Sequence, residues 1–101
     1  MTYRALLSQE AEGQFLTAHN WWLENRPASP NLLVDEFEEM VSLLEILPEA
    51  GHLFRRATIP GVRRILLRKS NYWLYYVPDR PHSVVYVLAV WSAHRGSDPP
   101  V

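Results

Sequence analysis

Three apolar runs in the second half of the chain predict three consecutive β-strands. Each run is rich in β-branched or aromatic side chains and is bounded by turn-forming residues, and the runs cover residues 62–67, 72–77 and 84–91. The break at 69–71 is short enough for a hairpin and places Asn71 where a positive φ is tolerated. The break at 78–82 contains two prolines, which cannot donate to a strand ladder. We therefore expect an antiparallel meander at the centre of a sheet.

An amphipathic segment near the start of the chain predicts a first helix. Ser8 can accept a hydrogen bond from an unpaired backbone N–H, and acidic residues follow it in the first turn, where the helix dipole is positive. The helix is expected to run to about Asn25. Its apolar face recurs at steps of four, three and four residues: Ala11, Phe15, Ala18 and Trp22.

A second amphipathic segment follows after a proline-containing break. Ser29 is the expected N-cap and Pro30 the first helical residue, and the helix is expected to run to about Leu47. Its apolar face is formed by Leu33, Phe37, Met40, Leu44 and Leu47. Its acidic residues are expected to be solvated: Asp35, Glu36, Glu38, Glu39 and Glu45.

The remaining segments complete the element order. Residues 2–7 are compatible with a short strand that joins the sheet, and residues 52–60 form either an irregular connection or a short strand. The order β-α-α-β-β-β predicts one α+β domain over residues 1–101, with a helical hairpin packed on one face of a mostly antiparallel sheet. We expect the opposite face to be free. No tract approaches the ~20 apolar residues of a membrane span, so we expect no membrane partner and a cytoplasmic location.

Charge is distributed unevenly, although the net charge is only -1. Residues 1–51 contain two basic and nine acidic residues, whereas residues 52–101 contain eight basic and two acidic ones. The helical half is therefore acidic and the sheet half is basic. The basic half either attracts an acidic partner or a nucleic-acid backbone, or is neutralised by the acidic half within the fold.

The usual signatures of enzymatic chemistry are missing from the sequence. It contains no cysteine, and its four histidines are scattered without metal-ligand spacing, so we expect no metal and no other cofactor. There is no glycine-rich phosphate loop, nucleophile elbow or pair of carboxylates in the sheet half. The one suggestive pair is His94 and Arg95, with Arg63 as a second cation on a neighbouring strand; the alternative is that this pair is ordinary polar surface.

The aromatic residues of the predicted strands have two possible roles. Trp73, Tyr75 and Tyr86 alternate with apolar neighbours, so their rings either fill the core or stack on nucleic-acid bases. A core role is the more common one for aromatic residues in strands.

Several short motifs, in this order and at these spacings, resemble those of the RelE/ParE superfamily of bacterial type II toxins. The resemblance extends from residue 3 to residue 95. The motifs are Ser8-Gln9-Glu10-Ala11-Glu12, the segment from Leu43 to Gly51, Gly61-Val62-Arg63, Tyr72-Trp73-Leu74-Tyr75-Tyr76, and the closing segment from Val87 to Arg95. The family has the same β-α-α-β-β-β arrangement as the one predicted above.

The superfamily divides into ribosome-dependent messenger-RNA nucleases and poisons of DNA gyrase, and this chain departs from the nuclease pattern. The expected Gly-Tyr-Arg in the third strand is Asn71-Tyr72-Trp73, and the arginine expected two residues before Arg95 is Ala93. The tyrosine expected in the tail has no counterpart. The resemblance therefore implies a ParE-like gyrase inhibitor that is not an enzyme and is neutralised by a cognate antitoxin in a hetero-oligomer.

Two alternatives remain open at this point. One is a RelE-like, metal-independent endoribonuclease that acts on messenger RNA at the ribosome through Arg63, His94 and Arg95. The other is a binding protein that keeps the toxin fold without toxicity. In each case the residues expected to meet the target or the antitoxin are Arg63, Arg64, Trp73, Trp91, His94 and Arg95. We expect a C-terminal segment of the antitoxin to wrap the helical hairpin and reach the sheet, where its acidic residues meet Arg63 or Arg95.

Overall fold

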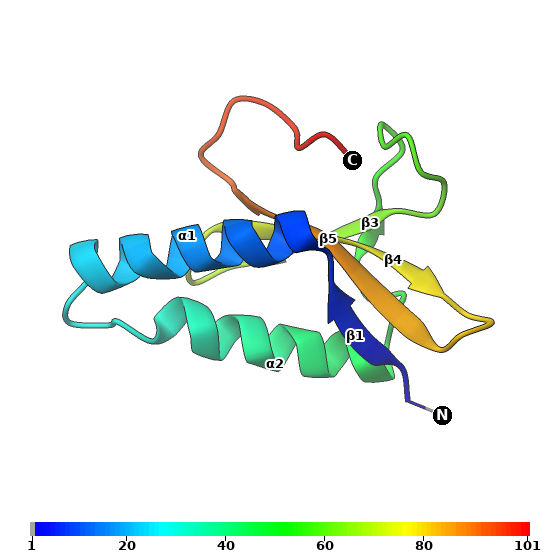
Figure 1. Ribbon diagram of the computed structural model, residues 1–101, viewed down its shortest axis with the longest axis horizontal. Helices are drawn as coiled ribbons and strands as arrows, with labels where there is room; N and C mark the ends of the chain where they lie inside the picture. The colour runs from blue at the N-terminus through cyan, green and yellow to red at the C-terminus, as the bar shows by residue number, and fades with distance from the viewer. Residues whose placement is uncertain (1) are drawn as a thin grey trace.

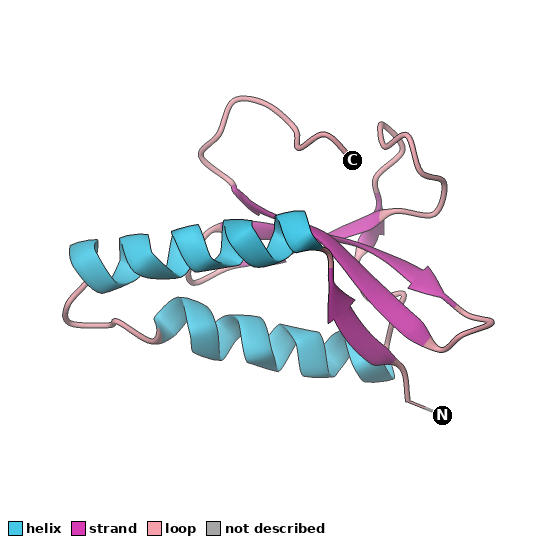
Figure 2. Ribbon diagram, viewed as in Figure 1, coloured by secondary structure: helices cyan, strands magenta, loops and turns pink. Residues whose placement is uncertain are grey.

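The computed structural model describes residues 2–101 as two helices packed against a five-stranded sheet (Figure 1). In chain order the elements are β1 (Arg4–Leu7), α1 (Gln9–Asn25), α2 (Leu32–Ile46), β2 (His52–Leu53), β3 (Arg63–Leu67), β4 (Tyr72–Asp79) and β5 (Val84–Ser92). The strand order is β1-β5-β4-β3-β2. Among the described residues, the β1–β5 pairing is parallel and the other pairings are antiparallel. The predicted α+β class is confirmed, and the helical hairpin lies on one side of the sheet (Figure 2).

The helix boundaries follow from their caps. Ser8 Oγ accepts a hydrogen bond from Ala11 N at 3.0 Å, and α1 ends at Asn25, as predicted. The predicted start of α2 is wrong: Asn31 is the N-cap, and Ser29 and Pro30 lie in the preceding turn. The backbone explains the difference, because Ser29 N bonds to Arg26 O, so this segment forms a separate turn before the helix begins.

The strand pairings place the two predicted hairpins. Asn71 has φ 62° in the turn between β3 and β4, as predicted. β4 extends to Asp79, two residues beyond the predicted end. Pro78 is tolerated there because β3 begins opposite Tyr76, so this part of β4 lacks a partner on the β3 side. Of the two readings of residues 52–60, the short strand is present as β2, and an irregular loop follows it.

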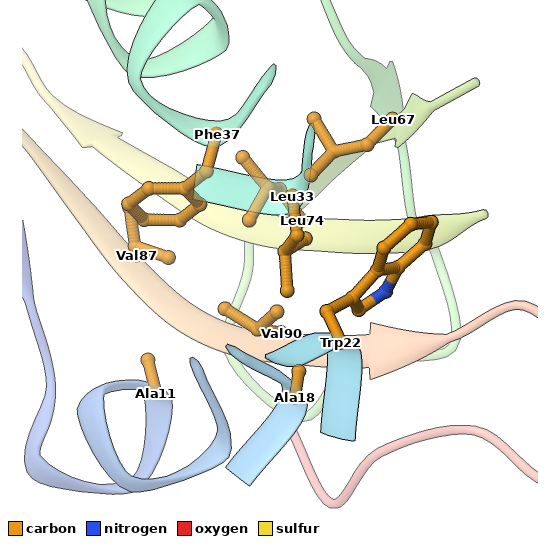
Figure 3. Packing of buried hydrophobic residues seen from close by; sticks show 9 residues of the cluster. All are labelled: Ala11, Ala18, Trp22, Leu33, Phe37, Leu67, Leu74, Val87 and Val90. Atoms are coloured by element: carbon orange, nitrogen blue, oxygen red, sulfur yellow. The ribbon is translucent and has the colours of Figure 1, made fainter. Parts of the chain in front are cut away.

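The main core lies between the helices and the sheet, where side chains from α1 and α2 converge on β3, β4 and β5 (Figure 3). The buried residues of this cluster are Ala11, Ala18, Trp22, Leu33, Phe37, Leu67, Leu74, Val87 and Val90. Both predicted helical faces are thus largely confirmed. Leu47 is an exception: it is the C-cap of α2 and is 54% exposed, because the helix has ended before it.

Two acidic residues of α2 are structural, contrary to the expectation that they are solvated. The Glu36 carboxylate accepts hydrogen bonds from Lys69 N, Ser70 N and Ser70 Oγ. The Glu45 Oε2 accepts a hydrogen bond from Ala5 N at 2.9 Å. Each carboxylate replaces a backbone acceptor that the neighbouring segment does not provide.

The sheet face opposite the helices is not free, contrary to prediction. The loop after β2 and the C-terminal tail meet over it, and Thr58 N donates to Val101 O at 2.9 Å (Figure 1). Beneath them lies a second buried cluster formed by Phe54, Val62, Tyr75 and Ala89. This face therefore has its own small core.

The two edges of the sheet differ. At the β1 edge, Tyr3 N donates to Glu45 O at 2.7 Å and Ala5 N donates to the Glu45 carboxylate. At the opposite edge, β2 pairs only with Arg63 and Arg64, so within residues 2–101 no strand covers the rest of β3 on that side. One edge is therefore covered by α2, and the other has no neighbouring strand over residues 65–67.

Among residues 2–101, no helix has the length and apolar character needed to cross a membrane.

Candidate functional site

The two adjacent arginines of β3 lie on opposite sides of the sheet, because successive side chains of a strand alternate. Arg63 is on the helix side, where its Nη1 donates to Gly51 O at 2.7 Å and to Glu49 O at 3.3 Å. These contacts tie β3 to the segment that follows α2. Arg63 therefore has a structural partner in the folded chain.

Arg64 lies on the opposite side, held among aromatic rings. Its guanidinium carbon is 4.1 Å from the ring centroid of Trp73 and 5.4 Å from that of Phe54. Its Nη1 donates to Tyr75 Oη at 3.1 Å. Cation–π contacts of this kind are worth about 0.5–2 kcal/mol each, and here they fix the orientation of the guanidinium.

A second arginine–tryptophan contact lies on the neighbouring strand. The guanidinium carbon of Arg95 is 3.9 Å from the ring centroid of Trp91, and Trp91 Nε1 donates to Ser97 O at 2.7 Å. Trp73 and Trp91 are direct partners in the β4–β5 register. The structure thus brings four of the six predicted binding residues into one row, which we call the Arg–Trp row: Arg64, Trp73, Trp91 and Arg95.

The other two predicted residues lie outside this row. Their separation can be measured along β4, which pairs with both neighbouring strands. Arg63 lies opposite Tyr76, and Ser92, two residues before the exposed His94, lies opposite Tyr72. Tyr72 and Tyr76 are four residues apart on β4, which corresponds to roughly 13 Å along the strand. The set Arg63, His94 and Arg95 is therefore not assembled around one point.

A basic hollow adjoins the Arg–Trp row and was not predicted from the sequence. It has a volume of about 420 Å³. Three arginines, a histidine, two aromatic residues and a leucine line it: His52, Leu53, Phe54, Arg55, Arg56, Arg64 and Trp73. Among residues 2–101, no acidic side chain lines it. In the sequence, the doublet Arg55-Arg56 was the signal that could have indicated a basic site. The sequence does not show that this doublet lies near Arg64; the pairing of β2 with β3, which places His52 opposite Arg64, does.

One carboxylate of the C-terminal tail pairs with an arginine that lines this hollow. Arg56 Nε donates to Asp98 Oδ2 at 2.9 Å, and this partner raises the pKa of Arg56. Both side chains are exposed, so the pair contributes little to stability. Arg55 and Arg64 have no such carboxylate among residues 2–101, and no three metal-ligating side chains come together in that part of the chain.

Solved structures share the fold of this chain. The chromosomal ParDE TA system from P. aeruginosa gives a TM-score of 0.70 at 14% identity, covering 92% of this chain and 98% of that one. The isolated E. coli RelE toxin gives 0.53 at 25% identity, covering 94% and 88%. A mutant E. coli RelE in complex with an antitoxin RelBc peptide gives 0.54 at 24% identity, covering 94% and 87%. The architecture is thus that of the small α+β toxins.

The sequence places the chain within this class. The family described as "ParE toxin of type II toxin-antitoxin system, parDE" matches residues 5–96, so the chain belongs to the ParE toxin family. No curated protein matches it. The resemblance to the RelE/ParE superfamily is confirmed, and with it the assignment as the toxin of a toxin–antitoxin system.

Proposed function

We propose that this toxin stops growth by binding DNA gyrase in the cytoplasm and is held inactive in a hetero-oligomer with its antitoxin. The observation that carries this choice is the position of Trp73. Its ring stacks under Arg64 at the place where the nuclease pattern has an arginine. A ring at that place cannot supply the positive charge that in-line cleavage of RNA needs. A binding toxin needs only a surface, and the Arg–Trp row is a surface of the kind that dominates protein interfaces.

The ribonuclease alternative asks more of the same residues. Cleavage without a metal requires cations around the developing charge and a group that moves the proton. Arg63 already donates to two backbone carbonyls on the helix side, away from His94 and Arg95. This arrangement favours the gyrase proposal over the nuclease. A binding protein without toxicity would use the same surface.

Expression without the antitoxin separates these possibilities. We expect induction of the DNA-damage response, and we expect the purified toxin to produce cleaved DNA in an assay with purified gyrase, while translation reporters are at first unaffected. Exposed His94 has no role in this proposal, so His94→Ala should leave toxicity largely intact. Loss of toxicity in that variant, together with loss of messenger-RNA cleavage on ribosomes, would establish the nuclease. Absence of any growth defect would establish the non-toxic binder.

A further inference from the structure

The geometry points to the basic hollow beside Arg64 as the site where carboxylates of an acidic, extended segment of the antitoxin bind, with Arg64 and Arg55 as the residues that receive them. This inference rests on the proposed function, since it names the place and chemistry of the antitoxin contact. It also differs from the sequence-based expectation, in which the acidic residues meet Arg63 or Arg95. Arg63 is already committed to Gly51 O and Glu49 O.

The charges around the hollow select an anionic ligand. Three arginines and a histidine line the hollow, and no acidic side chain in the described part of the chain does so. Among residues 2–101, the one carboxylate that pairs with an arginine of this hollow is that of Asp98 on the tail, and its partner is Arg56. Arg55 and Arg64 thus bring positive charge together without compensation, which favours binding of an oppositely charged group.

The aromatic surroundings prepare Arg64 for this role. Its guanidinium lies against Trp73 and is oriented by the hydrogen bond to Tyr75 Oη, so its remaining N–H groups are held in fixed directions. A planar guanidinium held in this way matches the two oxygens of a carboxylate. Fixing it before binding also reduces the entropy lost on association.

The C-terminal tail shows that a segment carrying a carboxylate can lie against the loop after β2, beside this hollow. Asp98 binds Arg56 with hydrogen bonds of 2.9 and 3.4 Å, and Val101 O accepts from Thr58 N at 2.9 Å. The tail therefore crosses the loop after β2 with one carboxylate and one backbone contact. A partner segment can use the same chemistry on the neighbouring Arg55 and Arg64.

The occupant is a protein carboxylate rather than a nucleic-acid phosphate because of the charge of the whole molecule. Nucleic-acid binding draws most of its affinity from many phosphate contacts. This chain has a net charge of -1 and places nine acidic residues in its first 51, which opposes a long polyanion. A short segment with two or three carboxylates meets only the local positive charge.

The test uses the full-length toxin and the product of the reading frame beside its own, purified together and separately. The double variant Arg55→Gln/Arg64→Gln should weaken their binding at least about tenfold, as expected for the loss of close charge pairs. Its affinity should also change less between 50 and 300 mM salt than that of the wild type. The control Arg4→Gln/Arg68→Gln removes the same charge from two other exposed arginines and should stay within about threefold of the wild type.

Two further measurements keep the test decisive. Because loss of Arg64 also removes its ring contacts, thermal unfolding is measured for each variant. Arg55→Gln alone, at an exposed position, should still weaken binding about threefold. A twenty-nucleotide single-stranded DNA serves as the phosphate probe and should not bind measurably at 150 mM salt.

Each contrary result has a distinct meaning. If the double variant binds the neighbouring product as tightly as the wild type, this inference is overturned and the proposed function stands. If the wild type does not bind that product at all, both the antitoxin part of the proposed function and this inference are overturned. If only the oligonucleotide binds in a manner that depends on Arg55 and Arg64, the hollow is a phosphate site and the carboxylate assignment is overturned.

Discussion

Glu36 and Ser70 join α2 to the turn between β3 and β4. Glu36 Oε1 accepts from Ser70 Oγ at 2.7 Å and from Ser70 N at 2.9 Å, and Oε2 accepts from Lys69 N at 2.7 Å. Ser70 is only 6% exposed, so these donors have little access to water. One side chain therefore supplies the acceptors for the donors of Ser70, the buried residue of this turn.

Glu36→Ala should lower the free energy of unfolding by about 2–3 kcal/mol, because it leaves the donors of Ser70 without a partner. Glu39→Ala, on the same helix and exposed, should change it by less than about 0.5 kcal/mol. Urea denaturation of the two variants measures the difference. Equal effects would mean that the contact to Ser70 contributes nothing beyond the removal of an acidic side chain.

The difference between the sheet edges should be visible in amide hydrogen exchange. Ala5 N is bonded to Glu45, whereas no strand covers the edge of β3 at Leu66 within residues 2–101. We expect the Leu66 amide to exchange at least about 100-fold faster than the Ala5 amide in the free protein. Glu45→Ala should accelerate exchange at Ala5, and Glu45→Gln, which retains an acceptor oxygen, should accelerate it less. Slow exchange at Leu66 would show that this edge is covered in solution.

Two glycines should respond oppositely to the same substitution. A Cβ on Gly51 would lie 2.7 Å from Tyr76 Oη and 2.8 Å from Arg64 O, so Gly51→Ala should cost about 1–3 kcal/mol through overpacking. A Cβ on Gly13, in α1, meets nothing within 4 Å. Gly13→Ala should therefore stabilise the protein by up to about 1 kcal/mol, since alanine favours the helix. Thermal unfolding distinguishes the two signs, and a stabilising Gly51→Ala would contradict the close approach of Tyr76.

Stability should decline at alkaline pH because of Tyr76. Burial raises the pKa of Tyr76, which its hydrogen bond from Gly51 N only partly offsets. The folded state then holds this proton more tightly than the unfolded state. Stability is therefore unaffected by this group below the unfolded pKa of about 10 and falls as pH rises above it.

Tyr76→Phe removes this titration, so its free energy of unfolding should fall less steeply above about pH 10 than that of the wild type. The variant also loses the acceptor for Gly51 N and should be less stable by about 1–3 kcal/mol at neutral pH. Tyr86→Phe, at a residue 38% exposed, is the control for the removal of a tyrosine hydroxyl elsewhere on the protein. Identical slopes for the wild type and Tyr76→Phe would contradict the raised pKa.

The predictions that succeeded depend on local chemistry. Ser8 caps α1 and Asn71 takes a positive φ because each needs only its own neighbours in sequence. The roles of Glu36 and Glu45 could not be predicted, since their partners lie 33 and 40 residues away. Strand alternation shows that Arg63 and Arg64 face opposite ways, but apolar residues follow on both faces of β3, so the pattern does not say which arginine faces the helices.

The parallel pairing of β1 with β5 also bears on how the chain reaches this structure. Beside this pairing, Ser8 Oγ donates a hydrogen bond to Leu88 O, and these two residues are 80 positions apart in the sequence. By contrast, β3, β4 and β5 are joined by short turns. Closing the longer loop costs more entropy, so the meander is expected to assemble first and β1 to dock last. During synthesis, β1 emerges from the ribosome long before its partner exists. The sheet therefore cannot be completed until translation has passed β5, so no toxin surface that depends on the finished sheet is present on a partly made chain.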